Sequence, residues 1–170
     1  RLLSAALVSA SLLIACGGAD TDLEEIGQTP IPKSTPISLK LEKIGAFETG
    51  QYQVSAAEIP AFDPASKRLF VVNALSGAVD VLDLRDPTSP SLVAQITTDA
   101  VLSGSVVNSV AVHDGLVAVA SEAPVKTDPG RMALFRSRDL RLLGSVEVGA
   151  QPDMVTFTPN GKTVLTANEG

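Results

Sequence analysis

The chain has 170 residues, of which 45% are hydrophobic, 19% are charged and only 4% are aromatic, and its formal net charge is −6. This acidic balance argues against nucleic acid as a partner, because phosphate backbones are bound by basic surfaces. The small number of aromatic residues and the lack of tryptophan also argue against stacking platforms for bases.

The chain opens with one basic residue and a short apolar run. Arg1 precedes a stretch from Leu2 to Ala15 that carries no charge. A basic start followed by a short apolar core is typical of a secretory signal, and the run is shorter than the roughly 20 apolar residues that a membrane-spanning helix needs. Residues 1–15 are therefore predicted to be a signal peptide for export.

The single cysteine of the chain, Cys16, directly follows Leu13-Ile14-Ala15. This string resembles the lipobox of bacterial lipoproteins, in which the cysteine is acylated and becomes the first residue of the mature protein. The resemblance implies lipidation of Cys16 and a membrane partner, since several acyl chains together anchor a protein stably. We expect the protein in the bacterial cell envelope. The alternative is an ordinary signal peptide with a cysteine near its cleavage site.

The segment after the cysteine is polar and contains Pro30, Pro32 and Pro36. Proline disrupts both helices and strands, so we expect residues 16–37 to be the lipidated cysteine and a flexible tether. Such a tether holds a folded domain away from the membrane surface. The folded domain is expected over residues 38–170.

Beyond the tether the sequence repeats itself. Residues 58–74 align without a gap on residues 153–169, and residues 108–122 form a weaker copy between them. The implied period of about 47 residues lies in the range of β-propeller blades. Tight-hairpin dipeptides at Asp114-Gly115 and Asn160-Gly161 separate short apolar runs. Strands are accordingly predicted at 58–62, 68–73, 78–84, 91–97, 108–112, 116–121, 131–136 and 141–148.

Four strands in each period predict an all-β fold. We expect a β-propeller of four-stranded antiparallel blades, with about two and a half blades in residues 38–170. Residues 41–50 are similar to 141–149, so a lone fourth strand is expected at 39–48, ahead of the first blade. This strand and the strand at 162–168 are expected to lack a partner on at least one side. A β-sandwich is the alternative, although a sandwich does not require the repeat.

Three strings carry a resemblance to a known family. AAEIPAFDPASKRLFVVNALSGAVDVLDLRDPTSPSLVAQI, SVAVHDGLVAVASEAPVKTDPGRMALF and GAQPDMVTFTPNGKTVLTANEG resemble successive blades of choice-of-anchor I proteins, over about residues 39–170. The resemblance implies a bacterial surface propeller of a kind often labelled alkaline phosphatase-like or joined to nuclease and phosphatase modules. It implies no particular catalytic residues. Residues 152–165 are also similar to NHL- and YVTN-type propellers.

The sequence contains no nucleophile elbow, zinc-protease motif or phosphate-binding loop. The single histidine, His113, is predicted to be a solvated hairpin residue, and one histidine with one cysteine is too few for a His/Cys metal site. The turns at Asp63-Pro64, Arg85-Asp86-Pro87 and Thr158-Pro159 are interpreted as plain turns.

Oxygen ligands remain, at one end of the predicted blades. First strands begin there and second strands end there, and these positions carry Glu58, Asn73, Asn108, Glu122, Asp153, Asn168 and Glu169. We predict that these residues form a ligand-binding rim around the channel, since carboxylates and amides can hold Ca²⁺. The alternative is that they end strands by bonding local backbone.

Two functions stay open at this point. The first is a membrane-tethered lipoprotein whose propeller is a scaffold or a ligand-binding module without a catalytic motif. The second is a calcium-dependent phosphoester hydrolase, which the family label favours. Catalytic residues are unknown, and calcium at the rim is the one candidate cofactor.

Overall fold

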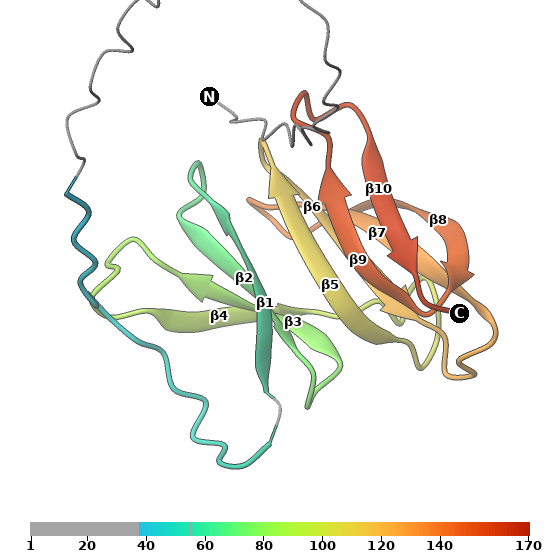
Figure 1. Cartoon of the computed structure of the whole chain (residues 1–170), viewed down its shortest axis with the longest axis horizontal. Coiled ribbons are helices and arrows are strands. Elements are labelled where there is room, and N and C mark those ends of the chain that lie inside the picture. The colour runs from blue at the N-terminus through green and yellow to red at the C-terminus, as the bar shows by residue number, and fades with distance from the viewer. Residues whose placement is uncertain (1–37, 55) are drawn as a thin grey trace, which may run out of the picture. The chain divides into compact units, whose positions relative to one another are not determined.

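The computed structural model describes residues 38–54 and 56–170, and within these it contains strands and no helix (Figure 1). The predicted signal peptide, Cys16 and the tether fall outside the described residues. No segment of the described part forms a helix long and apolar enough to cross a membrane.

The first four strands form one antiparallel sheet in chain order (Figure 1). They are β1 (Ala57–Asp63), β2 (Arg68–Asn73), β3 (Ala78–Asp83) and β4 (Ser91–Ile96). The next four form a second sheet of the same topology: β5 (Val106–His113), β6 (Leu116–Glu122), β7 (Pro129–Arg136) and β8 (Leu142–Ala150). A two-stranded sheet follows, made of β9 (Pro152–Phe157) and β10 (Val164–Asn168).

Each of the eight strands predicted for the two full repeats is present, with bounds that differ by two residues or fewer from the expected ones. The predicted fold class is confirmed as an all-β, propeller-like arrangement of antiparallel four-stranded sheets that is not closed. The turn chemistry explains the register, since Asp114 and Gly115 both adopt positive φ, at 43° and 79°. Asp and Gly tolerate this left-handed conformation, so β5 and β6 can reverse over two residues.

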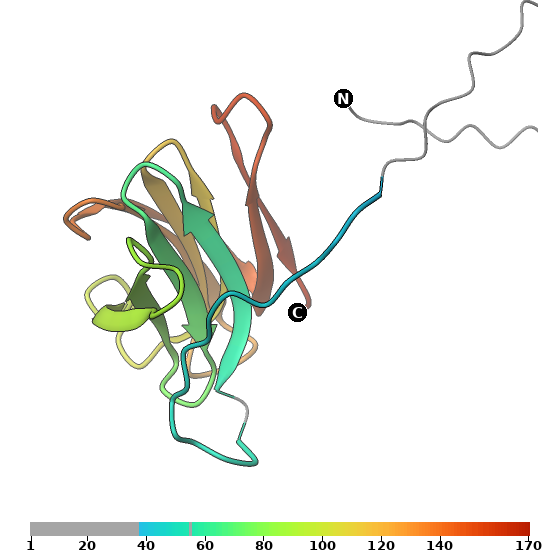
Figure 2. The same cartoon turned by 90° about the vertical axis from the view of Figure 1, so that its left-hand side faces the viewer.

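The sheets pack face to face through alternating apolar side chains. Phe70 and Val72 of the first sheet meet Val117 and Val119 of the second in one buried cluster. On the opposite face of the second sheet, Ala118 and Ala120 pack against Val155 of β9 in another cluster. Figure 2 shows the β9–β10 hairpin beside the second sheet, on the side away from the first. Both faces of the second sheet are therefore covered, as in the interior of a propeller.

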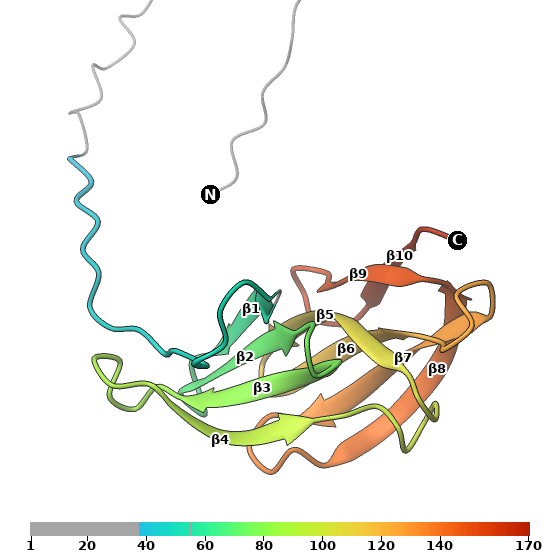
Figure 3. The same ribbon diagram turned by 90° about the horizontal axis from the view of Figure 1, so that it is seen from below.

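The first strands of the sheets lie on one side and the last strands on the other. Figure 3 shows β1, β5 and β9 toward one side and β4 and β8 at the opposite side. The outermost strand β8 is mostly exposed, and within the described residues β10 pairs with β9 alone. The strand order matches a blade that begins near the propeller axis and ends at its outer edge.

The lone strand expected at residues 39–48 is not formed. Residues 38–49 have no regular secondary structure. Within the described residues, no strand offers them a hydrogen-bonded ladder, and an isolated strand is unstable without one. Part of this segment instead lies over the first sheet: Gly45 sits against the carbonyl oxygen of Pro87, and Phe47 lies near β1 and β3.

Candidate functional site: the polar rim and the contacts between sheets

First strands begin, and second strands end, at the same end of every sheet. Ala57 pairs with Asn73, Val106 with Glu122, and Pro152 with Asn168. Two bonds connect these ends between sheets: the Val107 amide donates to the Gly77 carbonyl at 3.1 Å, and the Asn108 side chain donates to the Pro152 carbonyl at 3.3 Å. We call this end, with its seven predicted residues, the polar rim.

Asn108 and Glu122 are in contact within the rim. Asn108 Nδ2 lies 3.3 Å from Glu122 Oε2, and Lys126 Nζ lies 3.6 Å from Glu122 Oε1. Lys126 therefore partly neutralises the Glu122 carboxylate, whose side chain is largely buried. Because Asn108 also bonds the start of β9, this group joins the second and third sheets as well as lining the rim.

The two other rim asparagines have close protein contacts. Asn73 Nδ2 donates to Asp80 Oδ2 at 2.8 Å, and Asn73 Oδ1 accepts from the Ser76 amide at 3.2 Å. The second bond is to local backbone, as expected if Asn73 serves to end its strand. Asn168 packs against Gly149, where a Cβ would come within 2.9 Å of Asn168 Cγ. Both side chains thus have structural contacts.

The remaining rim residues are exposed carboxylates, namely Glu58, Asp153 and Glu169. Among the described residues none of the three forms an ion pair. Residues 38–54 and 56–170 contain no group of three or more His, Cys, Asp or Glu side chains placed to hold a metal ion. The carboxylates are therefore spread along the rim and free to meet solvent, and the role of the rim in binding stays a prediction.

The opposite end contains a polar contact that the sequence did not indicate. Asp63, which ends β1, is 1% exposed, and its Oδ2 accepts from Ser137 Oγ at 2.5 Å and from Ser66 Oγ at 2.6 Å. Burial alone would raise the pKa of this carboxyl. The hydrogen bonds from Ser137, Ser66 and the backbone outweigh burial and hold the pKa below its ordinary value. Asp63-Pro64 does lead into a turn, as interpreted from the sequence, but the Asp63 carboxylate also bonds a neighbouring sheet, which was not expected.

Ser137 lies in the loop between β7 and β8, so its bond to Asp63 joins the first and second sheets. Arg68 strengthens the same junction, because its Nη1 donates to the Ser137 carbonyl at 2.6 Å. The Ser137 amide in turn donates to the Gly115 carbonyl at 2.8 Å. We call Asp63, Ser66, Arg68 and Ser137 the inter-sheet lock.

His113 is also placed differently from expectation. Its side chain is 29% exposed, its ring lies 5.6 Å from that of Phe157, and it packs directly against Gly161. Nε2 lies 3.4 Å from the Asp114 carboxylate. His113 therefore joins the second and third sheets and is not a solvated hairpin residue. In the internal repeat, His113 aligns with Asp63. This alignment was the one sequence signal that both residues face a neighbouring sheet.

Comparison with known proteins gives one family and a shared fold. The model of the choice-of-anchor I domain matches residues 58–170. Among solved structures, hydrazine synthase of Kuenenia stuttgartiensis is similar with a TM-score of 0.52 and 19% sequence identity, over 67% of this chain and 31% of that chain. The chain thus spans about a third of that relative, and at this identity the likeness concerns the fold alone. No curated protein matches.

Proposed function

The chain belongs to the choice-of-anchor I family, and from this membership we propose that it is a lipoprotein of the bacterial cell envelope. Cys16 carries the acyl chains that hold it at a membrane. The propeller-like domain then serves as a scaffold or ligand-binding module on the cell surface. The observation that carries the proposal is the family match over residues 58–170, since membership implies association with the cell surface.

The sequence before the domain supports lipid anchoring. Cys16 follows Leu-Ile-Ala at the end of an uncharged run, and a polar, proline-containing stretch comes after it. A lipid anchor requires a cysteine at the processing site and a spacer that frees the domain from headgroups. Both features are present in the order that anchoring needs.

The polar rim supports ligand binding at one end of the domain. Glu58, Asp153 and Glu169 are exposed there, and the rim's asparagines and Glu122 hold neighbouring strands in place. Exposed carboxylates on a rigid edge favour a cationic ligand or a cation such as Ca²⁺, because like charges repel until they are neutralised. The proposed ligand is therefore positively charged.

Membrane fractionation tests the anchor. The Cys16→Ser variant is expected to accumulate unprocessed or to leave the membrane fraction, because serine has no thiol to acylate. Ser11→Ala, in the same apolar run, is the matched control and should fractionate as the parent does. Palmitate labelling of the parent and the control, but not of Cys16→Ser, supports lipidation. Labelled, membrane-bound Cys16→Ser protein would refute it.

Thermal unfolding with added calcium chloride tests the charge of the ligand. Binding to the folded state raises the melting temperature by mass action. Asp153→Asn should reduce the rise, whereas Asp114→Asn, at the opposite end in a turn that asparagine tolerates, should leave it unchanged. An equal rise in both variants would place the ion away from the rim. No rise at all would remove calcium as the ligand while leaving the anchor unaffected.

A further inference from the structure

The end of the domain opposite the polar rim is formed by the turns that follow β1, β3, β5, β7 and β9. Contacts bring neighbouring turns together: the Leu84 amide donates to the Lys67 carbonyl at 2.8 Å, and Gly161 packs against His113. We call these five turns, residues 64–67, 84–90, 114–115, 137–141 and 158–163, the turn end. Both ends of a propeller stay exposed, because its sheets pack on one another through their faces and not through their strand ends.

The turn end carries a surplus of positive charge. Four of its cations are exposed and form no ion pair within residues 38–54 and 56–170, namely Lys67, Arg138, Arg141 and Lys162. Arg85 and Arg136 are each paired with an aspartate. Among the carboxylates of these turns, Asp86 and Asp114 are exposed without a Lys or Arg partner. Unpaired cations thus outnumber unpaired carboxylates at this end.

The polar rim has the opposite charge. Besides the three exposed carboxylates described above, the loops at that end expose Asp99 and Asp128. In the described part of the rim the cations are Lys126 and Arg131, and each of them pairs with a glutamate. The net charge of −6 is therefore distributed unequally, with most of the uncompensated negative charge at the rim.

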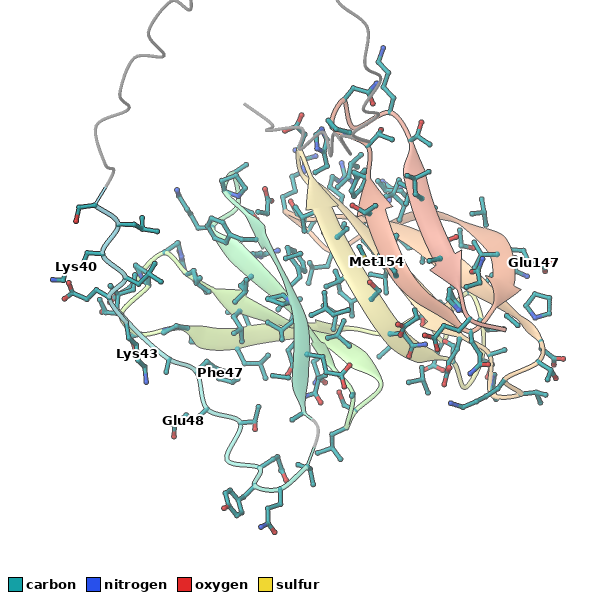
Figure 4. All side chains as sticks on the ribbon, in the orientation of Figure 1. Lys40, Lys43, Phe47, Glu48, Glu147 and Met154 are labelled. Atoms are coloured by element: carbon teal, nitrogen blue, oxygen red, sulfur yellow. The ribbon has the colours of Figure 1, made fainter. Side chains whose placement is uncertain are left out.

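The chain reaches the first sheet at the turn end. Gly45 packs against the Pro87 carbonyl in the turn after β3, whereas Glu48 lines a cleft together with Asn73 of the rim. The segment that joins them runs along the first sheet from the turn end toward the rim, and Figure 4 labels Phe47 and Glu48 on it. The predicted tether, which precedes this segment, therefore leads to the turn end.

We propose that the anchored domain directs its turn end toward an anionic membrane and its polar rim away from the lipid. This orientation rests on the lipid anchor proposed above. The predicted tether leaves the domain free to rotate, so charge decides which end faces the headgroups. Anionic headgroups attract the four unpaired cations and repel the carboxylates of the rim within a Debye length of the surface.

The anchor makes a weak attraction sufficient. A tethered surface meets its binding site at a high effective concentration, so a few cations orient a domain that would not bind the membrane by itself. The acidic net charge of the whole chain is compatible with this, since the carboxylates lie mostly at the far end. In this orientation the rim faces outward, where a ligand from solution can reach it.

Energy transfer to labelled lipids measures which end lies nearer the membrane. Cysteine is introduced singly at two exposed serines that flank β4, Ser89 at the turn end and Ser103 at the rim. The six residues of β4 place them about 20 Å apart along the strand. Each variant of the full-length lipidated protein carries a donor dye on the introduced thiol. It is added to preformed vesicles that contain an acceptor-labelled lipid, made of phosphatidylcholine with or without phosphatidylglycerol.

On vesicles with phosphatidylglycerol, the label on Ser89→Cys is expected to transfer at least about twofold more energy than the label on Ser103→Cys. The difference should shrink in about 0.5 M salt, which screens the charges, and on vesicles of phosphatidylcholine alone. Equal transfer from the two positions on anionic vesicles would overturn the orientation. A difference that survives both high salt and neutral lipid would overturn its electrostatic cause.

Charge removal tests which cations are responsible. Arg138→Gln combined with Lys162→Gln should lower the ratio of the two transfer efficiencies toward one on anionic vesicles. Lys126→Gln, at an exposed position of the rim, is the control and should not lower the ratio. An unchanged ratio in the double variant would show that the turn end does not attract the membrane.

The parent protein separates a failure of the anchor from a failure of the orientation. Its one cysteine is Cys16, so a lipidated parent takes up no maleimide and sediments with both kinds of vesicle. A parent that reacts with maleimide, or that stays in solution, would refute the lipid anchor and the orientation with it. A sedimenting, unlabelled parent together with equal transfer from the two labels would refute the orientation alone.

Discussion

Ser137 donates a 2.5 Å hydrogen bond to the buried carboxylate of Asp63, across 74 residues of sequence. Asp63 ends the first strand of one sheet, and Ser137 lies in the outer loop of the next. Apolar packing alone leaves two sheets free to slide, since it has little directional preference. A directional bond at one end of the interface therefore fixes the angle and register between neighbouring sheets.

Removing the serine hydroxyl should destabilise the domain. Ser137→Ala deprives a buried carboxylate of one donor, which costs about 1–3 kcal/mol of unfolding free energy. Ser89→Ala, in an exposed turn, is the control and should change stability by less than about 0.5 kcal/mol. Chemical denaturation of both variants measures the difference. Equal unfolding midpoints would show that the Ser137 hydroxyl makes no net contribution to the stability of the domain.

The buried Asp63 carboxylate of the inter-sheet lock should also make the unfolding free energy depend on pH in the acid range. Because the folded-state pKa of Asp63 lies below its ordinary value of 3.8, its contribution is complete above that value. The contribution is lost as the pH falls from there through the folded-state pKa. Unfolding midpoints measured between neutral pH and strong acid should therefore fall less steeply in Asp63→Asn than in the parent. Parallel profiles would contradict the assignment.

Gly161 should be intolerant of a side chain. It adopts a φ of +66°, and a Cβ there would collide with the His113 ring. The left-handed conformation alone costs a non-glycine residue about 1–2 kcal/mol. Gly161→Ala is thus expected to lower the unfolding free energy by at least that amount. Gly144→Ala, where a Cβ meets nothing within 4 Å, should be neutral, and similar losses in both would exclude the His113 contact as the cause.

Phe70 should be the costliest single truncation between the first two sheets. Its side chain is fully buried in the cluster that joins them. Replacing a buried Phe by Ala costs about 3–5 kcal/mol through lost transfer energy and the cavity left behind. Leu92→Ala, at an exposed position on β4, removes a similar apolar group and should cost less than about 1 kcal/mol. Denaturant unfolding of the two variants gives the comparison.

Local patterns were enough to predict the sheets. The turns at Asp114-Gly115 and Asn160-Gly161 lie between alternating apolar runs, and the repeat gives four strands per unit. The turn and strand signals lie within a few residues of the structures they specify, and the repeat groups those strands into units. The strand expected at 39–48 shows the limit of this reasoning, because similarity to a paired strand does not supply a partner to pair with.

The contacts between sheets could not be predicted in the same way. Asp63 and Ser137 are distant in sequence and come from different repeats, and Asp63 followed by proline has the composition of an ordinary turn. His113 likewise gains its burial from the turn of the next sheet. The rim residues could be located from topology alone, because antiparallel pairing places the start of one strand beside the end of the next. Their hydrogen-bond partners depend on rotamers that topology does not define.

Mass spectrometry of the N-terminal peptide of the membrane-bound protein tests the central claim most directly. The account predicts that the mature protein begins at Cys16 and that this residue carries acyl chains through its sulfur. An N-terminal peptide that begins elsewhere, or that contains Cys16 with a free thiol, would contradict the lipid anchor.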